Sequence, residues 1–159
     1  MTKQVIIPLP DRDFDTTEVA IPWKHFVEAG LHVTFSTETG QIGQTDPRLL
    51  TGVIFGQLGA KPDALAAYRE LEKDEAFRHP IPYESINPQQ YDVLLLPGGH
   101  AKGMRQYLES KVVQNKALEF FKYNKTKWLA PSATASWYWQ GQSILTREEA
   151  CCMGESSPG

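Results

Sequence analysis

Three aspartates that alternate with other residues, Asp11, Asp13 and Asp15, follow an apolar run near the start of the chain. Closely spaced carboxylates of this kind are the ligands from which calcium-binding loops are built. The glycine and the later glutamate that complete such a loop are missing here. The spacing therefore favours a solvated turn, and we expect neither a metal nor a cofactor.

Glu18 and the run Gly98-Gly99-His100 are further candidates for chemistry. Glu18 stands where a helix is expected to begin, and acids are favoured in the first turn of a helix by its dipole. Gly98-Gly99 can form an ordinary turn, and His100 can be a solvated or capping side chain. Residue type alone leaves these structural roles open.

Composition and charge exclude several classes of protein. The 159 residues suit one domain, and 41% apolar with 22% charged residues is typical of a soluble globular protein. The net charge of −3 and the scattered Lys and Arg give no basis for binding nucleic acid. The first residues lack the apolar stretch typical of a signal peptide, and no apolar run approaches about 20 residues, so we expect neither a signal peptide nor a membrane helix. We therefore expect a cytoplasmic protein with no nucleic-acid or membrane partner.

The first third of the chain alternates between strand and helix patterns. Gln4–Leu9 is a β-branched apolar run, Glu18–Ala29 has apolar residues at helical spacing, and His32–Ser36 predicts a second strand. Gly30 is the expected stop signal, and Pro22 must kink the helix or lie near its start. The candidates for the helix cap are Asp15, Thr16 and Thr17. The pattern predicts an α/β fold.

Residues 37–90 interrupt this alternation. Residues 37–59 are rich in Gly, Thr and Gln, which predicts a loop with a short helical turn. A helix is expected over Pro62–Phe77, because proline suits the first helical position and apolar residues recur after it. We interpret residues 37–90 as an insertion between two strands of the sheet.

The pattern becomes regular again at Tyr91–Leu96, an apolar run typical of a strand buried on both faces of a parallel sheet. A short helix is expected over Met104–Leu108 and a longer one over Lys111–Tyr123. Residues 126–159 contain no convincing strand, although an α/β fold needs its next central strand there. The adjacent Cys151 and Cys152 of this stretch cannot form a disulfide framework.

Two strings, IPLPDRDFDTTEVAIPWKHFVEAG and YDVLLLPGGHAKGMRQYLES, resemble the ThiJ/PfpI superfamily. The resemblance covers residues 4–125 and implies the flavodoxin-like parallel sheet, with flanking helices, that is shared with class I glutamine amidotransferases. The insertion is similar to that of larger members, including the chaperone-like and glyoxalase-like branch. We expect an α/β domain over residues 1–125, with the 37–90 insertion, that is incomplete at its C-terminal end.

The resemblance also assigns roles to residues. In this family a cysteine on a tight strand-to-helix turn, in an AICHG-like string, is the nucleophile. A carboxylate from the first helix hydrogen-bonds the cysteine, which by position is Glu18. The Gly98-Gly99 turn, with the amides of Gly99 and His100, would supply an oxyanion hole. A small carbonyl compound as ligand and a homodimer are the partners that this implies.

The cysteine and its histidine are absent from the expected place, where the chain reads WLAPSATASWYWQGQ. Ser132 is a poor substitute, because no histidine follows it and Pro131 breaks the strand. The chain as written is therefore expected to be inactive. The alternative is that the intact gene product is a cysteine-dependent glyoxalase-, hydratase- or hydrolase-like enzyme for small electrophilic substrates.

The genetic code offers an explanation for the missing motif. When residues 130–141 are back-translated and read from the third base of each codon, the fixed bases allow A-I-C-H-G-V-L-V-L-A-R. The same frame over residues 146–154 allows T-G-R-S-V-L-Y-G. Our hypothesis is a one-base frame shift between about Lys125 and Ala130, which makes residues 126–159 an out-of-frame, truncating tail. The nucleotide sequence read one frame over from codon 126 tests this directly.

Overall fold

The computed structural model describes residues 2–51, 60–123 and 128–131. Within these residues, five strands form a parallel sheet in the spatial order β5-β3-β1-β6-β7. The expected α/β class is confirmed: the strands β3-β1-β6-β7 have the flavodoxin-like order 2-1-3-4, and β5 adds one strand outside β3. The strands are β1 (Gln4–Pro8), β3 (His32–Thr37), β5 (Ile81–Pro82), β6 (Val93–Leu96) and β7 (Trp128–Pro131).

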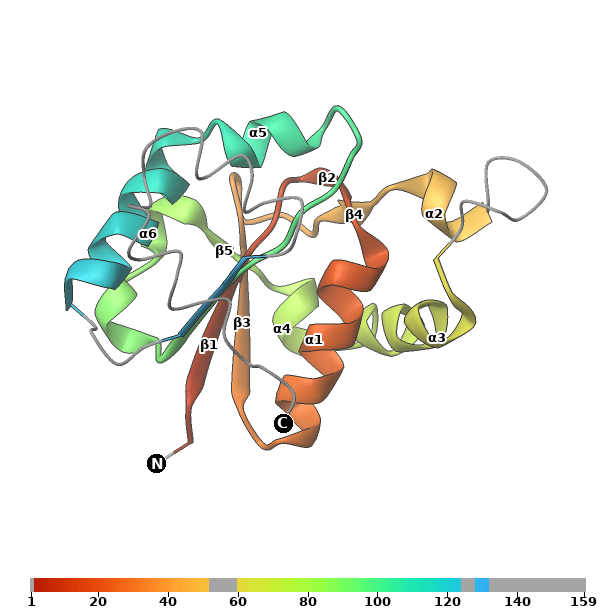
Figure 1. Ribbon diagram of the computed structural model, residues 1–159, viewed down its shortest axis with the longest axis horizontal. Coiled ribbons are helices and arrows are strands. Elements are labelled where there is room, and N and C mark those ends of the chain that lie inside the picture. The colour runs from red at the N-terminus through yellow and green to blue at the C-terminus, as the bar shows by residue number, and fades with distance from the viewer. Residues whose placement is uncertain (1, 52–59, 124–127, 132–159) are drawn as a thin grey trace, which may run out of the picture.

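Helices cover both faces of the sheet (Figure 1). On one face lie α1 (Thr16–Glu28), α3 (Pro62–Leu71) and α4 (Glu75–Arg78). On the other face lies α6 (Lys111–Tyr123), which is preceded by the short α5 (Met104–Leu108). The bounds of α5 and α6 agree with the expectation from the sequence. Two single-turn 3-10 helices, Tyr83–Ser85 and Pro88–Gln90, contact α6.

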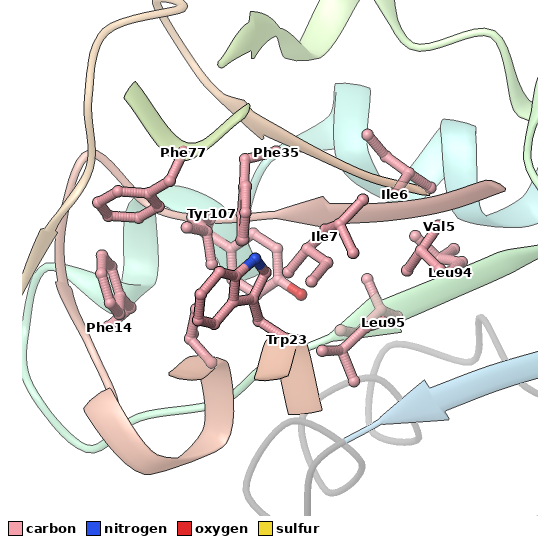
Figure 2. Packing of buried hydrophobic residues seen from close by; sticks show 14 of the residues in the cluster. Val5, Ile6, Ile7, Phe14, Trp23, Phe35, Phe77, Leu94, Leu95 and Tyr107 are labelled. Carbon is pink, nitrogen blue, oxygen red and sulfur yellow. The ribbon is translucent and has the colours of Figure 1, made fainter. Parts of the chain in front are cut away.

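The core is built around β1, the central strand, whose apolar residues are fully buried. Val5 is paired with Val33 of β3 on one side and with Val93 of β6 on the other. Figure 2 shows Ile7 and Trp23 in the buried cluster at this strand, with Leu94 and Leu95 further along. A strand enclosed in this way must be apolar along its whole length, which is why the run was recognisable in the sequence.

Helix α1 begins earlier than its apolar pattern indicated. Asp15 is the cap, and its Oδ1 accepts hydrogen bonds from the amides of Thr17 (2.8 Å) and Glu18 (3.1 Å). Pro22 lies in the interior of the helix rather than near its start. The helix ends where the sequence predicted, because Gly30 has a φ of 76° and its amide donates to the Val27 carbonyl.

The expectation of a simple insertion at residues 37–90 is wrong in two respects. First, the segment contributes β5, which pairs with β3 and so belongs to the main sheet. Second, it contributes β4 (Gln44–Thr45), which pairs with β2 (Arg12–Phe14) to form a separate two-stranded sheet. Residues 11–15 are therefore partly extended strand rather than a loop. A short helix, α2 (Pro47–Thr51), follows β4.

The single helix expected over Pro62–Phe77 is two helices. Helix α3 ends at Leu71, and Asp74 caps a new helix, α4, by accepting hydrogen bonds from the amides of Ala76 (2.9 Å) and Phe77 (3.2 Å). Because a capping aspartate requires extended backbone, it cannot lie inside a continuous helix. The change of direction brings Phe77 into the buried core.

The expectation that no strand follows the Lys111–Tyr123 helix is also wrong. Residues 128–131 form β7, which pairs in parallel with β6 from Val93 opposite Trp128 to Leu96 opposite Pro131. A strand of four residues is too short to show periodicity. Pro131 is tolerated because it is the last residue of the terminal strand among those described. Ser132, Cys151 and Cys152 lie outside the described residues, as does nearly all of the stretch that we interpreted as out of frame.

Among the residues that the structure describes, no helix is both long enough and apolar enough to cross a membrane.

Candidate functional site

The candidate site lies at the carboxyl ends of β1 and β6. These strands are neighbours, but the chain leaves β1 toward β3 on one side and returns to β6 on the other. Such a reversal opens a crevice at the ends of the two strands, where doubly wound proteins bind their ligands. The segment that follows β1 meets the turn that follows β6 at this point (Figure 1).

The first turn of α1 holds Gly98 by both of its backbone groups. Oε2 of Glu18 accepts a hydrogen bond of 2.5 Å from the Gly98 amide, and the Asp15 amide donates one of 3.3 Å to the Gly98 carbonyl. Glu18 is therefore more than a favourable first-turn charge. Its carboxylate joins segments that are 80 residues apart in the sequence.

The amides of Gly99 and His100 lie in the turn that follows β6, next to the Gly98 contact. No described residue accepts a hydrogen bond from either N–H group, and the side chain of His100 is exposed. Gly99 is required by packing, because a Cβ there would lie 2.9 Å from Cγ of Met104 and 3.3 Å from the Asp13 carbonyl oxygen. Two unpartnered amides in succession can stabilise negative charge on an oxygen atom.

A small hollow that is partly open to solvent lies beside this turn. Three carboxylates, those of Asp13, Asp15 and Asp46, contribute to its lining. His100 contributes the one imidazole. Sequence reasoning missed the contribution of Asp46, because nothing in its local pattern relates it to the Gly98 turn. The residues that line the hollow are Asp13, Asp15, Asp46, Leu49, Gly99 and His100.

Asp15 has a perturbed carboxyl group. Burial raises its pKa above the ordinary value of 3.8, and repulsion from Glu18 adds to this effect. Hydrogen bonds from the amides of Glu18 and Thr17 and the proximity of His100 lower the pKa in part. The net direction is upward, so the folded protein holds a proton on Asp15 more tightly than an exposed aspartate would.

Beneath the site, Tyr107 is completely buried. Burial raises the pKa of its hydroxyl well above the usual 10, and the charge of Glu18 contributes in the same direction. Tyr107 is therefore neutral at any ordinary pH and forms part of the apolar base under the carboxylate.

The three alternating aspartates do not form a metal site. Asp11 accepts a hydrogen bond from Gln106, Asp13 accepts one from Gly103, and Asp15 caps α1. Over the described ranges, no group of three or more His, Cys, Asp or Glu side chains is arranged to hold a metal ion. The solvated turn expected from the sequence is also wrong, because all three aspartates are half-buried and engaged.

The ThiJ/PfpI family-like model matches residues 9–148 of the sequence. This chain belongs to the ThiJ/PfpI-like family. It is also 33% identical over 111 residues to an uncharacterised protein of Schizosaccharomyces pombe. That match covers 69% of this chain but only 42% of the relative, so the chain spans less than half the length of the curated relative it matches.

Solved structures of ThiJ/PfpI-like proteins share the fold. A ThiJ/PfpI domain protein from Brachyspira murdochii superposes with a TM-score of 0.63 at 15% identity, covering 92% of this chain and 67% of that one. Glyoxalase III from Candida albicans gives 0.60 at 15% identity, with 97% and 72% covered. DJ-1 of Schizosaccharomyces pombe gives 0.55 at 17% identity, with 98% and 77% covered. At these identities the similarity establishes the fold alone.

Proposed function

We propose that this chain carries one half of a cysteine-dependent ThiJ/PfpI-like site and, without the nucleophile, does not turn over substrate. The observation that supports this is the contact between Glu18 and the Gly98 amide at the switch point of the sheet. Among the described residues, the neighbouring amides of Gly99 and His100 have no acceptor, which supports a role for them in binding a ligand. Glu18, Gly98, Gly99 and His100 are the site residues of this proposal.

The chemistry that these groups suit is addition to a carbonyl group. When a thiolate sulfur bonds to a carbonyl carbon, the electron pair of the C=O bond moves to the oxygen, which becomes anionic. The amides of Gly99 and His100 would stabilise that oxygen, while Glu18 would exchange a proton with the reacting groups. The hollow beside the turn is small, which suits a small substrate. Glyoxal-type dicarbonyls are our first candidates, because glyoxalase III shares this fold.

We propose further that the gene encodes the missing nucleophile in another frame. The support is the position of β7: its last residue, Pro131, lies opposite Leu96, close to where the Gly98 turn begins. A cysteine-bearing turn directly after β7 would therefore face the Glu18 carboxylate. Since residues 128–130 pair in register with β6, the frame shift would lie near Ala130, at the far end of the interval considered from the sequence.

Two proteins test these proposals: the 159-residue chain and a frame-corrected chain, shifted by one base near codon 130. We expect turnover of glyoxal and methylglyoxal, and rapid labelling of one thiol, only in the frame-corrected chain. Glu18→Gln in that chain should lower kcat by about 100-fold, as for loss of a general acid-base group. Equal activity in the two parent proteins would refute the proposed inactivity of the 159-residue chain.

The cellular setting follows from the same proposal. We propose a cytoplasmic protein that forms a homodimer when its sheet is complete. Fractionation of cells that express the frame-corrected chain, with light scattering on the purified protein, tests both statements.

A further inference from the structure

We propose that residues 11–15 form a bracket that positions the Gly98–His100 turn, and that Asp13 is its central positioning residue. The catalytic consequence rests on the proposed function, whereas the bracket itself is independent of it. The bracket contains Asp11, Asp13 and Asp15, which alternate with other residues. Strand β2 is irregular between Arg12 and Phe14, so this role does not follow from alternation in extended backbone. It follows from the contacts of the three residues, which all reach one neighbouring segment through a side chain or a backbone amide.

That neighbouring segment is 98–106, and the two make contact along their length. At one end, the Asp11 amide donates to Oε1 of Gln106 (2.9 Å), while Nε2 of Gln106 donates to Oδ2 of Asp11 (2.9 Å). At the other end, the Asp15 amide donates to the Gly98 carbonyl. Both ends of the turn are thus attached to the segment that follows β1.

Asp13 supplies the middle contact. Its Oδ2 accepts a hydrogen bond of 2.9 Å from the Gly103 amide. Gly103 permits this approach because it has no side chain: a Cβ there would lie 2.5 Å from Oδ2 of Asp13 and 2.8 Å from its Cβ. The pair therefore requires an acceptor on one segment and a glycine on the other.

The backbone of Asp13 supports the same interpretation. Its φ is 72°, and it is the one residue other than glycine with positive φ among those described. Aspartate and asparagine adopt this conformation at a lower cost than other side chains do, although the cost is not zero. A hydrogen bond to Gly103 would offset it. The unfavourable backbone conformation of Asp13 thus occurs at the same residue whose side chain holds the turn through Gly103.

The opposite side of the bracket is fixed in the core. Phe14 is completely buried and packs edge-on against Phe77, with ring centres 6.2 Å apart. Its carbonyl oxygen accepts hydrogen bonds of 3.0 Å from Oγ1 of Thr45 and from the Asp46 amide. Because Phe14 cannot move without disturbing the core, Asp13 beside it has a rigid support. The rigidity passes through Gly103 to the turn that carries Gly99 and His100.

The first test uses the 159-residue chain and the rate of amide hydrogen exchange at Gly103. Asp13→Gly keeps the positive φ but removes the acceptor, and we expect exchange at Gly103 to become about 10-fold faster. Asp13→Asn keeps both the acceptor and the conformation, so its rate should remain within about twofold of the parent. Asp63→Asn, an exposed change on α3, is the control for charge. An unchanged Gly103 rate in Asp13→Gly would overturn the bracket.

The second test uses the frame-corrected chain and separates positioning from substrate binding. Since Asp13 also lines the hollow, loss of a direct contact would raise KM. If Asp13 instead positions the turn, Asp13→Gly should lower kcat by about 10-fold with little change in KM. Asp13→Asn, which keeps the acceptor, should have the kcat of the parent. A KM effect alone would contradict the positioning role. If the parent frame-corrected chain has no activity, the proposed function fails, while the exchange test still decides the bracket.

Discussion

Single residues at this site serve more than one purpose, and Asp15 is the clearest case. Its side chain caps α1, its amide holds the Gly98 carbonyl, and its carboxylate lines the hollow. The capping bonds favour the ionised form, but burial and the nearby Glu18 oppose it, and the opposing effects prevail. Asp15 therefore combines a stabilising geometry with an unfavourable charge.

Substitutions at Asp15 should separate these two effects. Asp15→Ala removes the cap and should lower the free energy of unfolding by about 1 kcal/mol, whereas Asp15→Asn keeps an acceptor and should cost less. Because the folded-state pKa of Asp15 is raised above 3.8, its contribution to stability falls as the pH rises through that range. The free energy of unfolding of Asp15→Asn, relative to that of the parent, should therefore be higher at pH 7 than at pH 3. Urea titrations at both pH values measure this, and the opposite trend would contradict the raised pKa.

Gly99 is a second residue whose substitution has a defined consequence. In Gly99→Ala the new Cβ would approach Cγ and Sδ of the buried Met104 to 2.9 and 3.0 Å. We expect a loss of about 1–3 kcal/mol in the free energy of unfolding, typical of overpacking. In a double-mutant cycle with Met104→Ala, the penalty of the glycine substitution should shrink. Equal penalties in both backgrounds would show that the approach to the Asp13 carbonyl oxygen, at 3.3 Å, rather than the contact with Met104, disfavours a side chain at position 99.

At the scale of elements, α1 connects the site to the core. Its first turn carries Glu18, while Trp23 further along is buried in the hydrophobic core (Figure 2). Pro22 interrupts the backbone hydrogen bonds of the helix between these two parts, since proline has no N–H to donate. The helix continues because its buried face is held by the sheet and by α3.

Pro22→Ala should stabilise the chain, because alanine restores the missing donor and is the best helix former. We expect the free energy of unfolding to rise by about 1 kcal/mol, less than the full intrinsic difference because tertiary packing already enforces the helix. Thermal and urea unfolding measure this. Ile21→Ala, at the neighbouring half-buried position, is the matched control and should destabilise. A loss of stability in Pro22→Ala would mean that the proline ring contributes packing worth more than the hydrogen bond.

For the whole molecule, the sheet is the feature that determines behaviour in solution. Among the described strands β7 is terminal, so on one of its sides no described strand pairs with it. Unpaired strand edges promote association between chains. We expect the 159-residue chain to be marginally stable and to aggregate, and the frame-corrected chain to be well behaved. Size-exclusion chromatography and thermal unfolding compare the two. A sharp, cooperative transition in the 159-residue chain would count against this expectation.

Much of the fold could be predicted from the sequence, because several elements are defined by local patterns. After Gln4, strand β1 is apolar since both of its faces are buried, and Gly30 ends α1 since a positive φ favours glycine. The bounds of α5 and α6 follow from the helical spacing of their apolar residues, and Ser110 lies between the two helices. In each case the sequence pattern that identifies the element lies within a few residues along the chain.

Only the tertiary structure decided the rest of the site. The bond between Glu18 and Gly98 and that between Asp13 and Gly103 join residues 80 and 90 positions apart, and no local pattern encodes them. Strand β7 was missed because its four residues are stabilised by pairing with β6 rather than by their own periodicity. The alternating aspartates suggested a solvated turn by sequence alone. Their actual partners are brought to them by the sheet, which places the ends of β1 and β6 side by side.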